Sequence, residues 1–103
     1  MLTPMEIKER AIETKVGETF QISFWEDRTL GYAWYPTYDS TAFDFIEDDY
    51  QRTIQTHTAD SGKRVFGFLA LKSGSYKIQF EKKIGWKFTV ADRVIYQIQV
   101  KES

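Results

Sequence analysis

The sequence has no cysteine and only one histidine, His57, among its 103 residues. These scarcities exclude disulfide bonds, thiolate metal sites, a cysteine nucleophile and any metal site built from several histidines. The sequence also lacks a glycine-flanked serine elbow and a glycine-rich phosphate loop. Ser61, four residues after His57, is expected to belong to a polar loop. We therefore expect neither an enzyme nor a protein that carries a cofactor.

An excess of one charge and a long apolar run are missing as well. The 14 Lys and Arg residues nearly balance the 15 Asp and Glu residues, which leaves a net charge of −1. Nucleic-acid binding depends on clustered positive charge, so no nucleic-acid partner is expected. No run approaches the roughly 18 apolar residues of a membrane span, and the opening MLTPMEIKER has no apolar signal core. We expect no membrane association, and a protein that is cytoplasmic or a processed secreted form.

Apolar and aromatic residues are plentiful, at 42% and 17% of the chain. A chain of this length has room for one hydrophobic core. No repeat, linker or low-complexity tract divides it. We expect a single domain over residues 1–103, and a monomer.

Three segments alternate apolar and polar residues with a period of two, which is typical of strands with one buried face. The alternation occurs in FQISF, SYKIQFEK and RVIYQIQVK. The side chains predicted to point inward are Phe20, Ile22 and Phe24; Tyr76, Ile78 and Phe80; and Val94, Tyr96, Ile98 and Val100.

Less regular apolar runs over 31–35, 42–50 and 63–71, and a first strand over 7–14, bring the expected number of strands to about seven. The VFGFLAL stretch favours either a central strand covered on both faces or one with a bulge at Gly67. Tight turns are expected at KVGE and SGS. Residues 5–15 alternatively form a helix, because Glu, Lys, Arg and Ala favour one. Seven short strands predict an all-β, antiparallel sandwich.

The acidic cluster of Asp44, Glu47, Asp48 and Asp49 has two interpretations. Carboxylates are calcium ligands, but this cluster lacks the alternating ligand spacing and the glycine of a calcium loop. We expect a solvated acidic turn and no metal.

Three connections are candidate binding loops: 27–31, 57–62 and the segment EKKIGWKFTVAD at 81–92. In a sandwich, loops that join alternate strands gather at one end. Large apolar residues in the third segment, such as Trp86 and Phe88, are candidate anchors for a partner. Alternatively, these two side chains fold back over the open end of the core. Trp34 lies in a predicted strand and is expected in the core.

The first connection carries a motif that resembles one in a known family. The family pattern is Asn-Pro-Thr-Thr-Gly followed by an aromatic residue, any residue and tryptophan. In DRTLGYAW, at 27–34, Thr29, Gly31, Tyr32 and Trp34 match this pattern in register.

Two further motifs follow in the same order. The second family motif is Gly-x-Gly-Gly with a phenylalanine four residues later. It corresponds to ADSG at 59–62, where Gly62 and Phe66 match. The third motif, Arg-Pro-Trp, corresponds to IGW at 84–86. Over about residues 7–101 the chain thus resembles the chagasin family, proteinaceous inhibitors of papain-like cysteine peptidases. The resemblance implies an immunoglobulin-like sandwich.

The resemblance also implies a mechanism, in which the three loops form a wedge that occupies the peptidase cleft reversibly and without a covalent bond. The first loop lies at the catalytic centre, where Gly31 permits the turn, and the other two loops contact the flanking walls. The residues implied in peptidase binding are Thr29, Leu30, Gly31, Ser61, Gly62, Ile84, Gly85 and Trp86. The alternative is a non-inhibitory sandwich module that binds a carbohydrate or a protein through the same aromatic end, since tryptophan also suits sugar rings.

The motifs also differ from the family pattern. Asp27 and Arg28 replace Asn-Pro, which removes a fixed φ and a side chain that hydrogen-bonds its own turn, so a less preorganised first loop is expected. Leu30 stands where relatives carry threonine. In the third motif Ile84 and Gly85 replace Arg-Pro, which removes a polar contact and stiffness together.

Overall fold

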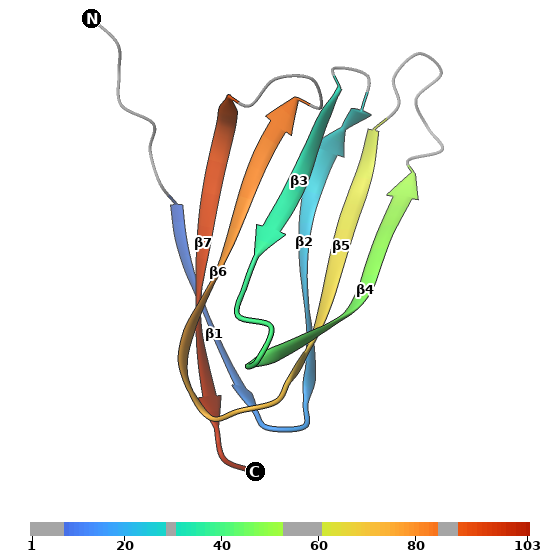
Figure 1. Cartoon of the computed structure of the whole chain (residues 1–103). Coiled ribbons are helices and arrows are strands. Elements are labelled where there is room, and N and C mark those ends of the chain that lie inside the picture. Colours follow the sequence, from blue (N-terminus) through green and yellow to red (C-terminus); the bar gives the residue numbers. More distant parts are fainter. Residues whose placement is uncertain (1–7, 29–30, 53–60, 85–88) are drawn as a thin grey trace, which may run out of the picture.

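The computed structural model describes residues 8–28, 31–52, 61–84 and 89–103, which form seven strands in two facing sheets (Figure 1). The first sheet has the order β1-β7-β6-β3 and the second β2-β5-β4, which confirms the predicted all-β sandwich. In the described ranges no helix is long and apolar enough to cross a membrane. The strands are β1 (Lys8–Lys15), β2 (Thr19–Asp27), β3 (Tyr32–Thr37), β4 (Phe43–Arg52), β5 (Ser61–Ala70), β6 (Gly74–Ile84) and β7 (Val90–Lys101).

Strand β1 departs from the expected antiparallel arrangement. It pairs with β7 in parallel, from Lys8 opposite Val94 to Lys15 opposite Lys101, whereas the other strand pairs are antiparallel. The helical alternative is wrong for residues 8–15, because pairing along β7 and the packing of Ile12 against the core override local helix propensity. The chain then crosses to the other sheet through a turn at Gly17, whose φ is +89°.

The hydrophobic core lies between the two sheets and confirms the period-two prediction. Phe66, Phe68 and Phe80 are fully buried, and Trp34, only 4% exposed, stacks on Phe24 with ring centroids 4.3 Å apart. Trp34 is therefore a core residue, as predicted. All the side chains expected to point inward belong to the core or pack against it: Phe20, Ile22, Phe24, Tyr76, Ile78, Phe80, Val94, Tyr96, Ile98 and Val100.

Strand β5 is the central strand of its sheet, as one interpretation of VFGFLAL predicted. The bulge belongs to β4 instead, where the register shifts between Phe45 and Glu47. Glu47 lies opposite Gly67, and a Cβ at Gly67 would come within 2.7 Å of the Glu47 Cβ. The glycine therefore lets the Glu47 side chain cross β5 and accept a hydrogen bond from Gln21 on β2.

The acidic cluster lies in strand β4 rather than in a turn, which corrects the sequence prediction. Charged side chains suit this position because β4 is an edge strand, where they discourage pairing with another chain. Asp48 forms an ion pair with Arg64, and Glu47 accepts the bond from Gln21. Across the described ranges, no three acidic or histidine side chains are grouped closely enough to hold a metal ion.

Three strands end and three begin at one end of the sandwich, hereafter the loop end (Figure 1). Strands β2, β4 and β6 run towards it, and β3, β5 and β7 start from it. The connections between these strands include residues 29–30, 53–60 and 85–88, which lie outside the described part of the chain. The strand arrangement thus confirms that the three candidate connections belong to the same end.

Candidate functional site

Strand register brings the bases of the three connections side by side at the loop end. Asp27, at the end of β2, pairs with Ser61 at the start of β5. Tyr32, at the start of β3, pairs with Ile84 at the end of β6. The strands on the two sides of the first connection are therefore hydrogen-bonded in different sheets. Strand β2 pairs with β5, which follows the second connection, and β3 pairs with β6, which precedes the third.

Half of the predicted site residues lie within the described structure. Gly31, Ser61, Gly62 and Ile84 are described, whereas Thr29, Leu30, Gly85 and Trp86 lie outside the described residues, as do His57 and Phe88. These four lie at or next to strand ends that border the three connections: Gly31 precedes β3, Ser61 and Gly62 begin β5, and Ile84 ends β6.

Gly31 closes a tight turn at the end of the first connection. Its φ is +78°, and its N–H donates to the carbonyl oxygen of Arg28 over 3.0 Å. A side chain at this φ would be strained, so glycine is the residue that the turn needs. This conformation agrees with the turn role that the resemblance implied.

Gly62 lies in strand β5 rather than in a loop. It is buried between the neighbouring strands, and a Cβ there would collide with the carbonyl oxygen of Gln51 and come within 2.9 Å of the Cα of Arg52. The glycine therefore allows β4 to approach β5 closely at the loop end. The expectation that 57–62 is a loop is wrong for its last two residues, because Ser61 pairs with Asp27 of β2 and Gly62 pairs with both neighbouring strands.

The third connection is shorter than expected, because β6 continues to Ile84 and β7 begins at Val90. Ile84 is half-buried beside Tyr32 and forms a base for the connection. Beside it, the ammonium of Lys82 lies 5.3 Å from the centre of the Tyr32 ring, within the range of a cation–π contact. Cross-strand contacts between β3 and β6 thus support this part of the loop end.

A buried carboxylate lies beneath the first connection. Glu26 is 0% exposed, and its Oε1 accepts the backbone N–H of Trp34 over 2.9 Å. Arg28 donates from Nε to Oε2 over 2.9 Å, and Arg64 donates from Nη1 to Oε1 over 3.0 Å. The charge that Glu26 places inside the protein is therefore balanced by two guanidinium groups from different segments.

Each guanidinium has a further contact. Arg64 binds Asp48 through two hydrogen bonds, of 2.5 Å from Nε and 2.9 Å from Nη2. These bonds and the charge of Glu26 raise the pKa of Arg64 above its usual value, so the guanidinium stays charged. The guanidinium of Arg28 lies 3.6 Å from the centre of the Tyr50 ring. Glu26, Arg28, Arg64, Asp48 and the Trp34 N–H together are termed the Glu26 network.

Sequence reasoning missed the Glu26 network, although one signal was present. The alternation of Phe20, Ile22 and Phe24 continues to Glu26, so the period of two places this carboxylate on the buried face. A charged residue in a buried register needs a partner of opposite charge. The alternation does not identify Arg64 as that partner.

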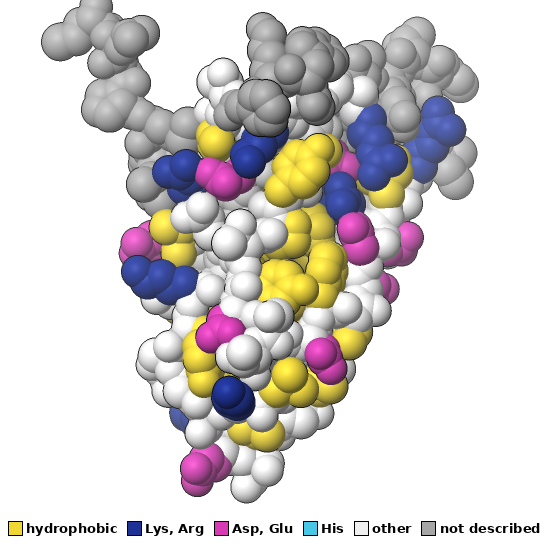
Figure 2. Space-filling view, viewed as in Figure 1, with side chains coloured by type: hydrophobic (Ala, Val, Ile, Leu, Met, Phe, Trp, Pro, Cys, Tyr) yellow, Lys and Arg dark blue, Asp and Glu magenta, His cyan; other side chains and the backbone are white. Residues whose placement is uncertain are grey.

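Figure 2 shows Lys and Arg side chains gathered near the loop end of the face in view, with apolar side chains below them. Trp25 on β2 is 61% exposed, and its carbonyl oxygen accepts the indole N–H of Trp34 over 3.2 Å. The outward position of Trp25 also follows from the alternation, since it lies between Phe24 and Glu26. The loop end therefore has a charged and aromatic border.

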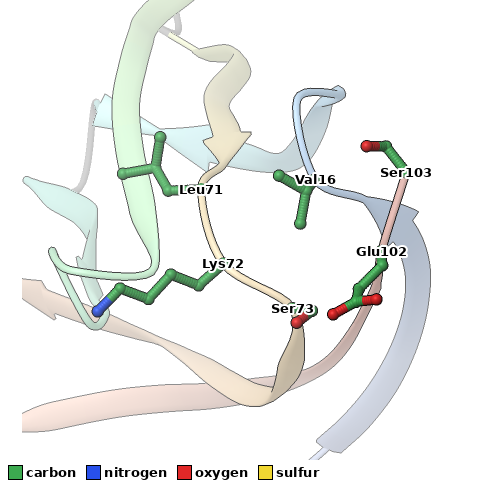
Figure 3. A pocket seen from close by; sticks show the side chains of 6 residues that line it. All are labelled: Val16, Leu71, Lys72, Ser73, Glu102 and Ser103. Atoms are coloured by element: carbon green, nitrogen blue, oxygen red, sulfur yellow. The ribbon is translucent and has the colours of Figure 1, made fainter.

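A separate cavity of about 590 Å³ lies at the opposite end of the sandwich (Figure 3). Val16 and Leu71 contribute apolar side chains, and the side chain of Lys72 points away from Ser73, Glu102 and Ser103. The lining is completed by Ser73, Glu102 and Ser103. Because these residues lie between strands that meet at the far end, the cavity takes no part in the arrangement of the three connections.

The fold and the loop end define a β-sandwich that presents three adjacent connections supported by paired strands. The sequence pattern of the chagasin family peptidase inhibitor I42 matches residues 13–100. The chain belongs to this family, which consists of peptidase inhibitors and not of enzymes, and this confirms the resemblance found in the loop motifs. Comparison with curated protein sequences finds no match.

Solved structures show the same fold. The cysteine protease inhibitor EhICP2 from Entamoeba histolytica is similar with a TM-score of 0.75 and 17% identity, over 94% of this chain and 97% of that one. Amebosin, solved in solution, has a TM-score of 0.65 and 17% identity over 98% and 100% of the two chains. PbICP-C, solved in complex with falcipain-2, has a TM-score of 0.66 and 14% identity over 96% and 91%.

Proposed function

We propose that this protein is a reversible, non-covalent inhibitor of papain-like cysteine peptidases that inserts its three loop-end connections into the active-site cleft. The observation that carries the proposal is the pairing of Asp27 with Ser61 and of Tyr32 with Ile84, which sets the bases of the three connections in one row. Membership of a peptidase inhibitor family supports it. Two structural neighbours add support, one described as a cysteine protease inhibitor and one solved with falcipain-2.

The physical basis of the proposed inhibition is preorganisation. A loop that orders only on binding loses conformational entropy, and a loop fixed by strand pairing on both sides loses less. Here the turn at Gly31 and the close approach at Gly62 are set by the sandwich itself. A rigid array of this kind binds a cleft with little change of its own shape.

The proposed roles of the site residues follow from their positions. Thr29, Leu30 and Gly31 approach the catalytic centre, and Gly85 and Trp86 contact a wall of the cleft. The remaining three, Ser61, Gly62 and Ile84, are strand residues at the bases of the connections and support them. In this proposal no covalent bond forms between the two proteins, and inhibition consists of occupying the cleft.

Titration of several papain-like peptidases with the purified protein tests the proposal. We expect inhibition that saturates at one inhibitor per peptidase, reverses on dilution and leaves the inhibitor chain uncleaved. Serine peptidases assayed in parallel serve as the control and should keep full activity. Absence of inhibition of every papain-like peptidase at micromolar concentrations would refute the proposal.

A further inference from the structure

We propose that the Glu26 network holds both sides of the first connection in their binding geometry, so that Glu26 and Arg28 are positioning residues for the peptidase contact. The inference rests on the proposed function for its consequence in inhibition. Its physical content, the control of the local structure around Gly31 by a buried charge, stands on the geometry alone.

Glu26 contacts the first connection from both sides. The side chain of Arg28, where the connection begins, donates to Oε2, and the backbone N–H of Trp34, where β3 is already formed, donates to Oε1. Between these two contacts the Gly31 N–H donates to the Arg28 carbonyl oxygen over 3.0 Å. One carboxylate therefore sets the separation of the two sides of the connection.

The network also extends to the strands that carry the second connection. Arg64 on β5 contacts both Glu26 and Asp48, and Asp48 lies on β4. Arg28 in turn lies over the ring of Tyr50, which is also on β4. Through these side chains the first connection is tied to both strands that flank the second one.

Burial makes the geometry specific. Glu26 is fully buried, and no buried side-chain nitrogen or oxygen in the described ranges lacks a hydrogen-bond partner. Buried ion networks often add little stability compared with apolar packing, but their directional hydrogen bonds restrict the relative positions of the groups that they join. A network of this kind at the loop end is therefore better suited to setting loop position than to stabilising the core.

The Glu26 network also supplies a restraint on the first connection in place of the Asn-Pro pair that the family motif has there. Asp27 and Arg28 stand where the family motif has Asn-Pro, and this predicted a less preorganised first loop. In the structure the Arg28 side chain is held by Glu26 and lies over Tyr50. A side-chain anchor thus takes the place of the backbone restriction that proline imposes.

Hydrogen exchange measured by NMR tests the inference without any peptidase. In Glu26→Gln, which keeps the size of the side chain but removes its charge, we expect the amides of Gly31 and Trp34 to exchange roughly tenfold faster or more. The amide of Gly17, hydrogen-bonded to Ala70 at the opposite end, is the internal reference and should not change. A uniform acceleration would indicate a general loss of stability, and unchanged Gly31 and Trp34 amides would indicate no positioning role; both overturn the inference.

Two matched variants keep the test decisive if Glu26→Gln folds poorly. Arg28 is exposed, so Arg28→Ala should leave the fold intact and still accelerate exchange at Gly31. Lys63→Ala changes an exposed side chain on β5 that is outside the Glu26 network, so Gly31 should keep its protection. Equal effects of Arg28→Ala and Lys63→Ala at Gly31 would contradict the inference.

A double-mutant cycle then connects the network to inhibition. If Glu26 acts through the first connection, Leu30→Ala should change the inhibition constant by a smaller factor in Glu26→Gln than in the wild-type protein. Trp86→Ala, in the third connection, should change the inhibition constant by the same factor in both backgrounds. Equal fold-changes for Leu30→Ala in both backgrounds would refute the positioning role. If the wild-type protein inhibits no peptidase, the proposed function fails, while hydrogen exchange still decides whether the network holds the connection.

Discussion

Gly62→Ala should destabilise the protein although it adds only one methyl group. The added Cβ would collide with the carbonyl oxygen of Gln51 and lie 2.9 Å from the Cα of Arg52, and both are backbone atoms that no side-chain rotation can move. Strand β4 must therefore shift away from β5. Overpacking of this kind costs about 1–3 kcal/mol.

Thermal and urea unfolding measure this cost. Each kcal/mol lowers Tm by roughly 4–8 °C in a domain of this size, so a decrease of at least about 4 °C is expected. Lys63→Ala is the matched control, because Lys63 is the next residue of β5 and is exposed, and its unfolding free energy should stay within about 0.5 kcal/mol of wild type. A Gly62→Ala protein as stable as wild type would refute the close-approach argument.

A shift of β4 has a second consequence. Asp48 and Tyr50 move with this strand, and both contact arginines of the Glu26 network. We therefore expect Gly62→Ala to weaken peptidase inhibition as well, even at temperatures where the variant is fully folded. Circular dichroism establishes the folded fraction before the inhibition constant is measured.

Three further predictions concern separate parts of the molecule. Trp86→Ala should weaken inhibition by about 2 kcal/mol or more if this side chain is a binding hot spot, and an unchanged inhibition constant would remove it from the contact. Trp34→Ala should lower the free energy of unfolding in urea by about 3–5 kcal/mol, because the indole is buried. Trp25→Ala, at an exposed position, should change this free energy by about 0.5 kcal/mol or less. Equal effects of the two substitutions would contradict the assignment of Trp34 to the core. A hydrogen bond from Arg93 lowers the pKa of Glu81 in the folded protein. The contribution of this carboxylate to folding stability is therefore present above the usual carboxyl pKa, and it is lost as the pH falls through the lower pKa of the folded state. The stability difference between wild type and Arg93→Ala should therefore shrink on acidification, and a constant difference would exclude this linkage.

The strands of the core were predictable because their alternation is local. Phe20, Ile22 and Phe24 point to one side of their strand in any sheet, so the sequence alone identifies the buried face. Trp34 followed from its place in a predicted strand. The loop motifs were local too, and they led to the family that the whole-chain comparison shows.

The errors arose where distant segments decide local structure. Residues 8–15 have helix-favouring side chains, but parallel pairing with β7 holds them extended. The acidic residues around Asp48 have the composition of a turn, yet an edge strand accommodates them. Gly62 matched a loop motif, and its close contact with Gln51 became apparent only once β4 was placed beside β5.

The apolar faces and the segments that connect them can be read from the amino-acid order, because side-chain alternation and turn formation depend on neighbouring residues. The meeting of Glu26, Arg28 and Arg64 beneath the first connection depends on the packing of the folded chain. Arg64 lies 38 residues from Glu26 along the chain, and sheet pairing brings their side chains to 3.0 Å. Pairing between distant strands is set by the packing of the whole core, which no local pattern specifies.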